Sequence, residues 1–353
     1  MSILIDDLYT YNDWANDKVL TLCDGLTDQQ LDTPREMGFG TLRATLFHIL
    51  TAEQVWMERW QEVPWRPFST DPAGMSVGTL RRALAVVAEQ RRELIDENRG
   101  DSFARRISYQ DSKKTPYDHV LSDLLLHVAS HGVHHRAQAL NYLRQFDRTL
   151  VGGVDYIFYR LATASVKQSC DSVMALKGYG LDVSDATDQP CPYDDAAVKR
   201  LFQYHDWATR QVLDFAADLP AESLDRDFQM GPGTIRKTLL HLYDGERWWP
   251  EIWKGSSVAY PTSRDDVTIA TLRKDWDSLS TQRREYLDQL TAQETQRVVS
   301  AQFGGPPINF RIGVSINQLA MHGTHHRAQL INMFRHVGAD WKNIDLLYAI
   351  EHL

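Results

Sequence analysis

The chain has 353 residues, of which 43% are hydrophobic and 24% charged, with a net charge of −9. This is the composition of a soluble globular protein with room for two domains, and the acidic balance argues against a nucleic-acid partner. No apolar run is long enough to cross a membrane, and the amino terminus lacks the basic start and apolar stretch of a signal peptide. Because Cys23, Cys170 and Cys191 form no paired motif, we expect reduced thiols and a cytoplasmic location.

Hydrophobic periodicity predicts four long helices in the first half of the chain, over residues 5–23, 41–60, 77–98 and 117–145. Thr41 follows a Gly-x-Gly turn, which suits the N-cap of the second helix. Between the third and fourth helices, residues 103–109 are expected to form a short extended segment or hairpin. Four long helices with one polar interlude indicate a four-helix bundle.

The second half of the chain repeats this plan, with helices predicted over residues 195–217, 234–254, 267–289 and 314–337. Residues 38–48 return as 231–241 with seven identities in eleven, and residues 131–138 return as 322–329 with seven in eight. A repeat this long marks two domains rather than an array of short units. We therefore predict an all-α chain of two tandem four-helix bundles: copy one (1–164), a linker or helical extension (165–193) and copy two (194–353).

Histidines stand out in the repeated blocks. His131 and His135 are one helical turn apart on an apolar face, so their side chains can converge on one metal ion. His48 has an equally apolar setting in the second predicted helix, and three histidines leave room for water at the metal. A single buried histidine is usually a hydrogen-bonded core residue, but three in each of two diverged copies favour metal binding. The equivalent residues of copy two are His241, His322 and His326.

Further polar residues recur beside these histidines. They could orient the ligands from a second layer, anchor an acidic substrate group, or only cap and bridge neighbouring helices. These residues are His134, Arg136 and Gln138 in copy one and His325, Arg327 and Gln329 in copy two. Glu53 and Glu246 also match, and we interpret them as surface or packing carboxylates rather than general bases. The repeated tryptophans at 14/207, 56/249 and 60/253 are interpreted as core residues.

The spacing of the paired histidines resembles that of the HExxH metallopeptidases, with one difference. In HExxH the first histidine is followed by a glutamate that acts as general base. Here that position is Gly132 in copy one and Gly323 in copy two. The missing base disfavours a peptidase.

The combination of His48 with His131-x-x-His-His135-Arg-x-Gln, and the opening Tyr11-Asn-Asp-Trp-Ala-Asn16, resembles the DinB/YfiT-like superfamily of metalloenzymes. The resemblance covers nearly all of both copies. It implies an up-down-down-up four-helix bundle with a long crossover, and a divalent metal, most often zinc or nickel, held by three histidines. The ligands it implies are His48, His131 and His135 in copy one, and His241, His322 and His326 in copy two.

The superfamily includes thiol S-transferases that use low-molecular-weight thiols, a thiol-dependent isomerase and a domain of ergothioneine-forming enzymes. The resemblance thus implies metal-dependent, thiol-dependent S-transferase-like chemistry on a small molecule. The alternatives are a metal-dependent hydrolase and a non-catalytic, metal-stabilised binding or stress protein. Single-copy relatives commonly pair as dimers, so the two copies here could form a pseudo-dimer within one chain.

Overall fold

The computed structural model describes residues 2–64, 66–150, 153–163, 191–261, 267–302 and 307–353. The chain divides into two compact units, Met1–Thr149 with Asp345–Leu353, and Leu150–Ile344. The predicted linker falls almost wholly outside the described residues, as does Cys170. Among the described residues, no helix is both long and apolar enough to span a bilayer.

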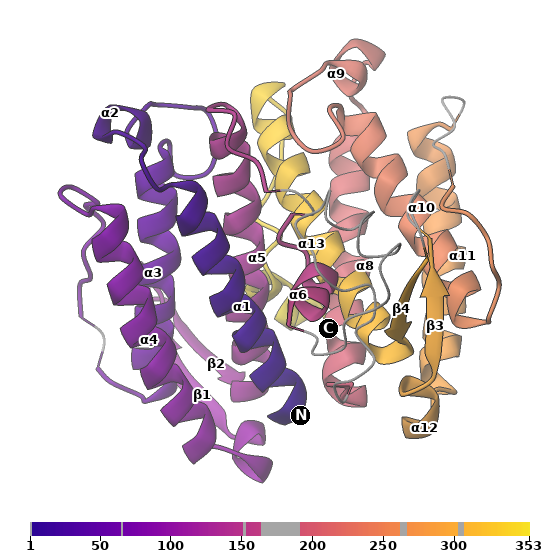
Figure 1. The fold of residues 1–353 in the computed structure, drawn as a ribbon, viewed down its shortest axis with the longest axis horizontal. Coiled ribbons are helices and arrows are strands. Elements are labelled where there is room, and N and C mark those ends of the chain that lie inside the picture. Colours follow the sequence, from indigo (N-terminus) through magenta and orange to yellow (C-terminus); the bar gives the residue numbers. More distant parts are fainter. Residues whose placement is uncertain (1, 65, 151–152, 164–190, 262–266, 303–306) are drawn as a thin grey trace, which may run out of the picture. The chain divides into compact units, whose positions relative to one another are not determined.

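Four long helices make up the body of the first unit: α1 (Ser2–Leu22), α3 (Leu42–Trp60), α4 (Val77–Glu97) and α5 (Leu121–Arg144). Both α1 and α3 pack against α4 and α5, so the four helices enclose one core. Helices α3 and α4 run in the same direction along the bundle, and α1 and α5 run in the other (Figure 1). This is the predicted up-down-down-up bundle with a long crossover. Short helices α2 (Asp28–Leu31) and η1 (Gly100–Ala104) complete the connections.

The second unit repeats the bundle with α8 (Asp195–Ala217), α10 (Ile235–Trp253), α11 (Ile269–Asp288) and α13 (Ile312–His336). Its helices α8 and α10 each pack against α11 and α13. The short helices α9 (Ala221–Asp225) and α12 (Ala292–Thr295) occupy connections between them. The predicted all-α class and the two tandem four-helix bundles are confirmed.

A turn before each of α3 and α10 fixes where the helix begins, and therefore where His48 and His241 lie. Thr41 and Thr234 are the N-caps, and their hydroxyls accept hydrogen bonds from the backbone N–H groups of Ala44 and Lys237. Gly38 and Gly231 both adopt φ of +48°, a left-handed conformation that strains residues with a side chain. The repeated Gly-x-Gly-Thr sequence thus sets where each helix begins.

Each bundle carries one small β-hairpin before its last helix. Strand β1 (Arg106–Gln110) pairs with β2 (Pro116–Val120), and β3 (Val298–Ala301) pairs with β4 (Ile308–Arg311), both antiparallel. The hairpin expected after residue 103 is confirmed. The predicted start of the fourth helix at residue 117 is wrong, because residues 116–120 form β2 and the helix begins at Leu121. The apolar residues of β2 continue the pattern of α5 and conceal this boundary.

Candidate metal centre

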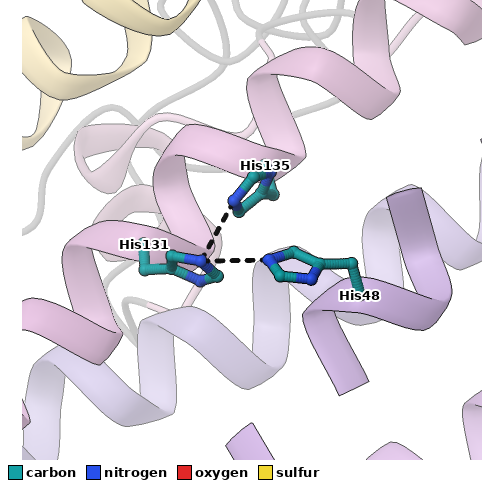
Figure 2. A group of neighbouring side chains, drawn as sticks. All are labelled: His48, His131 and His135. Carbon is teal, nitrogen blue, oxygen red and sulfur yellow. Dashed lines mark hydrogen bonds between the residues drawn. The ribbon is translucent and has the colours of Figure 1, made fainter. Parts of the chain in front are cut away.

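Three imidazole rings of copy one meet between α3 and α5. Figure 2 shows His48 reaching from α3 towards His131 and His135 on α5. The Nε2 atom of His131 lies 3.2 Å from Nε2 of His48 and 3.0 Å from Nε2 of His135. Nitrogens bound tetrahedrally to zinc at about 2.0–2.1 Å stand about 3.3 Å apart, so the three Nε2 atoms are close to ligand spacing. This group could hold a metal ion.

Copy two builds the same group between α10 and α13. Nε2 of His322 lies 3.0 Å from Nε2 of His241 and 3.0 Å from Nε2 of His326. In each group the ligand atoms lie within 4.8 Å of one another. The structure therefore brings together all six histidines named as candidate ligands, as two separate sets of three.

Burial keeps these imidazoles neutral. It lowers the pKa of His48 to about 2, with a smaller contribution from His135, and the pKa of His322 to about 3, with a contribution from His241. Burial is also the main cause of the lowered pKa values of His131, His135, His241 and His326. Neutral imidazoles have the free lone pair that metal binding requires. The donor set therefore fits a divalent metal at neutral pH.

A glutamine fixes the orientation of one ligand in each copy. Nδ1 of His135 donates to Oε1 of Gln138 at 2.8 Å, which leaves Nε2 free of a proton and facing the other two histidines. The Gln138 amide nitrogen then donates to Nε2 of His134 at 3.0 Å. In copy two, His326, Gln329 and His325 make the same contacts at 2.8 and 3.0 Å. Gln138, Gln329, His134 and His325 thus form a second layer of contacts.

Arg136 and Arg327 bridge helices instead. Arg136 donates from its Nη1 to the side-chain oxygens of Asn12 and Asn16 on α1. Arg327 donates to Nδ1 of His205 at 3.0 Å and to the hydroxyl of Thr209 on α8. Each arginine is only 1% exposed, so of the functions considered from the sequence, bridging fits and anchoring a substrate acid does not.

Each bundle also contains a buried ion pair on the helix that carries its first metal-site histidine. Glu53 on α3 pairs with Arg91 on α4 and accepts a hydrogen bond from Asn12 at 2.8 Å. Glu246 on α10 pairs with Arg283 on α11, and Nε2 of His205 lies 2.9 Å from it. The carboxylates are therefore packing residues, as one of the sequence interpretations had it, and are not at the surface.

This network contains residues to which the sequence analysis assigned no role. Asn12 and His205 occupy equivalent positions and both bridge an arginine to a glutamate, although one is an amide and the other an imidazole. Arg91 and Arg283 lie on the third long helix, where the two copies share little sequence. The repetition of Glu53 and Glu246 indicated that both copies need a cationic partner for this carboxylate, but it did not indicate that the partners are Arg91 and Arg283.

Packing explains why the position after the first helix-borne histidine is glycine. A Cβ on Gly132 would lie 2.4 Å from Oδ1 of Asn12, and one on Gly323 would lie 2.2 Å from the His205 ring. Both distances are far below van der Waals contact. There is no space for the glutamate of a metallopeptidase at either position.

The two groups differ in what covers the histidine from the second long helix. The ring of Phe39 stacks on His48, with ring centroids 3.9 Å apart, and is 48% exposed. Pro232 replaces it in copy two. There the hydroxyl of Tyr260 lies 3.1 Å from Nδ1 of His241, while among the described residues Nδ1 of His48 has no hydrogen-bond partner.

The repeated tryptophans are divided in their burial. Trp56, Trp60, Trp249 and Trp253 are at most 4% exposed and belong to the cores, as predicted. Trp14 and Trp207 are only partly buried.

A cavity of about 780 Å³ lies beside α3 and α4 and is lined by Phe47, Leu50 and Leu94, among others. None of the three metal-site histidines of copy one lines it.

Comparison with known proteins agrees with this architecture. A model of the DinB family matches residues 1–166 and again residues 193–352. A protein of Bacillus subtilis (strain 168) described as "Protein DinB" is 23% identical over 146 residues, which cover 39% of this chain and 85% of that protein. No solved structure gives a significant match. The chain belongs to the DinB family and carries the family's domain twice.

Proposed function

We propose that each group of three histidines binds one divalent metal, zinc or nickel, and that the metal supports thiol-dependent S-transferase-like chemistry on a small molecule. The ligands would be His48, His131 and His135 in copy one and His241, His322 and His326 in copy two. The observation that carries the proposal is the convergence of three neutral Nε2 atoms in both copies. Three neutral ligands would leave the full charge of the cation available to a fourth group.

The repeated glutamate near each histidine group is held in a buried ion pair, which favours a thiol over water as the nucleophile. A divalent metal supplies a Lewis acid that lowers the pKa of a bound thiol or water, and it deprotonates a thiol outright. Hydrolysis benefits from a general base, but the buried Glu53 is held by Arg91 and Asn12. Gly132 stands where metallopeptidases place their base. A reaction that needs no protein base fits these surroundings best.

The surroundings of His48 favour copy one as the place where a substrate enters. Phe39 is half exposed and offers a flat apolar face directly beside this histidine. His48 and His131 are only partly buried, as are His241 and His322 in copy two, so the exposed ring of Phe39 is what distinguishes copy one. A small molecule bound against Phe39 would thus have its reacting atom close to the three Nε2 atoms.

Metal content is the first test. Untagged protein, purified without a metal column, should contain about two metal ions per chain by elemental analysis. The His48→Ala and His241→Ala variants should each lose about one. His336→Ala, which removes a histidine at the end of α13 that belongs to neither group, is the control and should keep both. Metal-free protein, or a metal content indifferent to both histidine changes, would refute the proposal.

The reaction class needs a second test. Metal-loaded protein should convert electrophilic small molecules only when a low-molecular-weight thiol is added, and His48→Ala should abolish that activity. Turnover in the absence of thiol would instead identify a hydrolase. A chain that keeps both metals, converts no substrate of either kind and loses only stability on His48→Ala would be a metal-stabilised binding protein.

A further inference from the structure

The residues that follow the last long helix of each copy belong to the other unit. After α13 of copy two, residues 345–353 are part of the first unit, where α14 (Leu346–Ala349) packs on α5. After α5 of copy one, residues 150–163 are part of the second unit, where α6 (Tyr156–Ala162) packs on α13 (Figure 1). We call residues 345–353 and 153–163 the tails. Val154-Asp155 and Ile344-Asp345 occupy equivalent places in the repeat, so the two tails are exchanged reciprocally.

Both tails are docked by buried side chains. Tyr156 and Leu161 of α6 are 0% exposed, as are Leu346 and Ala349 of α14. Gln318 on α13 adds polar contacts, because its Oε1 accepts from the backbone N–H of Ile157 at 2.8 Å and its Nε2 donates to Asp155 at 3.3 Å. The tails are therefore integral parts of the units that receive them.

Each tail carries an aspartate at the N-cap of its short helix. An N-cap aspartate ordinarily accepts a hydrogen bond from the first turn, but neither Asp155 nor Asp345 makes such a bond. Instead Oδ1 of Asp345 lies 3.9 Å from Nδ1 of His134, and Oδ1 of Asp155 lies 4.0 Å from Nδ1 of His325. These distances exceed a direct hydrogen bond, so the carboxylates act on the imidazoles through their charge. The side chains of Asp345 and Asp155 are 15% and 21% exposed, so water screens that charge only partly.

A continuous series of polar contacts leads from each aspartate to a metal-site histidine. His134 accepts at Nε2 from Gln138, so its proton is on Nδ1, which faces Asp345. Gln138 in turn accepts from Nδ1 of His135, whose Nε2 faces His131. In the second unit the series is Asp155, His325, Gln329 and His326.

We propose that each metal centre is completed by the tail of the other copy, with Asp345 as a positioning residue for the first centre and Asp155 for the second. The inference rests on the metal binding proposed above. A carboxylate at the end of the series holds the proton of His134 on Nδ1, which keeps Gln138 turned with its oxygen towards His135. Outer contacts of this kind orient ligands and raise their basicity, and their loss typically costs 10–100-fold in metal affinity.

The test separates the two centres by disabling one at a time. In a His241→Ala chain only the first centre remains, and in a His48→Ala chain only the second. Asp345→Asn should weaken zinc binding about ten-fold in the first background, measured by competition with a chelator, and leave the second unchanged. Asp155→Asn should do the reverse. Asp345→Glu, which keeps the charge, should restore most of the affinity, a rescue that a merely packing role would not give.

The outcomes are distinct. Two metals on the unsubstituted chain would establish the metal binding on which this inference rests, whatever the tails do. An aspartate variant that lowers the metal affinity of the centre in its own copy, or of neither centre, would refute the proposal that each tail completes the centre of the other copy. If a single-centre chain fails to fold, the intact chain carries the test, because metal release to a chelator should quicken in a different phase for each aspartate variant. Both variants altering the same phase would refute the inference.

Hydrogen–deuterium exchange gives a readout that needs no metal. Deleting residues 345–353 should raise amide exchange in α5, on which α14 packs, and leave α13 unchanged. Faster exchange in α13 alone would show that the tail belongs to its own copy. This measurement keeps failure of the tail exchange distinguishable from failure of metal binding.

Discussion

The hydroxyl of Tyr260 lies 3.1 Å from Nδ1 of His241. With Nε2 of His241 turned towards His322, the ring proton is on Nδ1 and is donated to the tyrosine oxygen. The phenol is held in place by the ring of Trp248, whose centroid is 5.1 Å away. Pro67 and Val55 stand at the equivalent positions of copy one. Within the part of the chain that the structure describes, the second group of histidines therefore has an orienting contact that the first lacks.

Replacing this hydroxyl should affect one centre only. Tyr260→Phe should lower the metal affinity of the second centre about ten-fold, because the Nδ1 proton of His241 loses its acceptor. Chelator competition in the His48→Ala background measures this centre alone. The same substitution in the His241→Ala background is the control and should change nothing. Equal losses at both centres would show that Tyr260 acts through general stability.

Gly132 and Gly78 should respond to alanine with opposite signs. Both are helical, where alanine is favoured over glycine by up to about 1 kcal/mol. A Cβ at Gly132 would lie 2.4 Å from Oδ1 of Asn12, whereas the nearest atom to a Cβ at Gly78 is 3.6 Å away. Gly132→Ala should therefore lower the free energy of unfolding by about 1–3 kcal/mol, as overpacking does, and Gly78→Ala should raise it slightly. Denaturant titration of both variants checks the signs, and a stabilised Gly132→Ala would contradict the packing described here.

The buried ion pair of Arg91 with Glu53 should contribute far more to the free energy of unfolding than the exposed pair of Arg92 with Glu89. Arg91→Met leaves the carboxylate of Glu53, which is 5% exposed, without its cation and should cost about 3–5 kcal/mol of unfolding free energy. Arg92→Met breaks an exposed pair with Glu89 and should cost less than about 1 kcal/mol. Thermal or denaturant unfolding distinguishes them. Similar losses in the two variants would mean that Glu53 is stabilised by other groups.

Metal-free protein should become less stable as the pH falls below about 6.5, the ordinary pKa of histidine. Burial lowers the folded-state pKa of His48 to about 2 and of His322 to about 3, so the unfolded chain binds protons that the folded chain refuses. The stabilisation is complete above pH 6.5 and is lost as the pH falls towards those values. Each such histidine contributes a slope of about 1.4 kcal/mol per pH unit.

Denaturant midpoints between pH 7 and pH 5 measure this slope before most carboxylates titrate. His48→Gln should reduce the slope. A slope that is the same in both proteins would show that His48 is protonated as readily in the folded chain as in the unfolded one.

Much of this fold could be predicted from local sequence. The long helices follow from apolar periodicity, and α3 and α10 start where Gly-x-Gly-Thr requires them to. The strand before α5 could not be recognised, because Tyr117 and Val120 extend the apolar pattern of the helix and pair with β1 only in three dimensions. Repetition, the one-turn spacing of the paired histidines and the family resemblance identified the histidine groups, since apolar periodicity by itself does not distinguish a ligand from a core residue.

The surroundings of the site were less predictable because their partners are distant in sequence or differ in type. Asn12 and His205 make equivalent contacts with the buried glutamate of their copy, but one is an amide and the other an imidazole. A comparison of the two copies therefore does not reveal them as equivalent. Arg91 and Arg283 lie on helices that have diverged. The exchange of the tails depends on pairing across some two hundred residues, which leaves no trace in local periodicity.

The reciprocal tails also impose an order on biosynthesis. A ribosome releases the helices of the first bundle long before it reaches residues 345–353, the segment that packs on α5. Until residues 345–353 appear, the surface of α5 that α14 covers is bare. The domain that is translated first is therefore finished after the second, and a nascent chain that stalls before residue 345 would carry a complete second bundle and an incomplete first one.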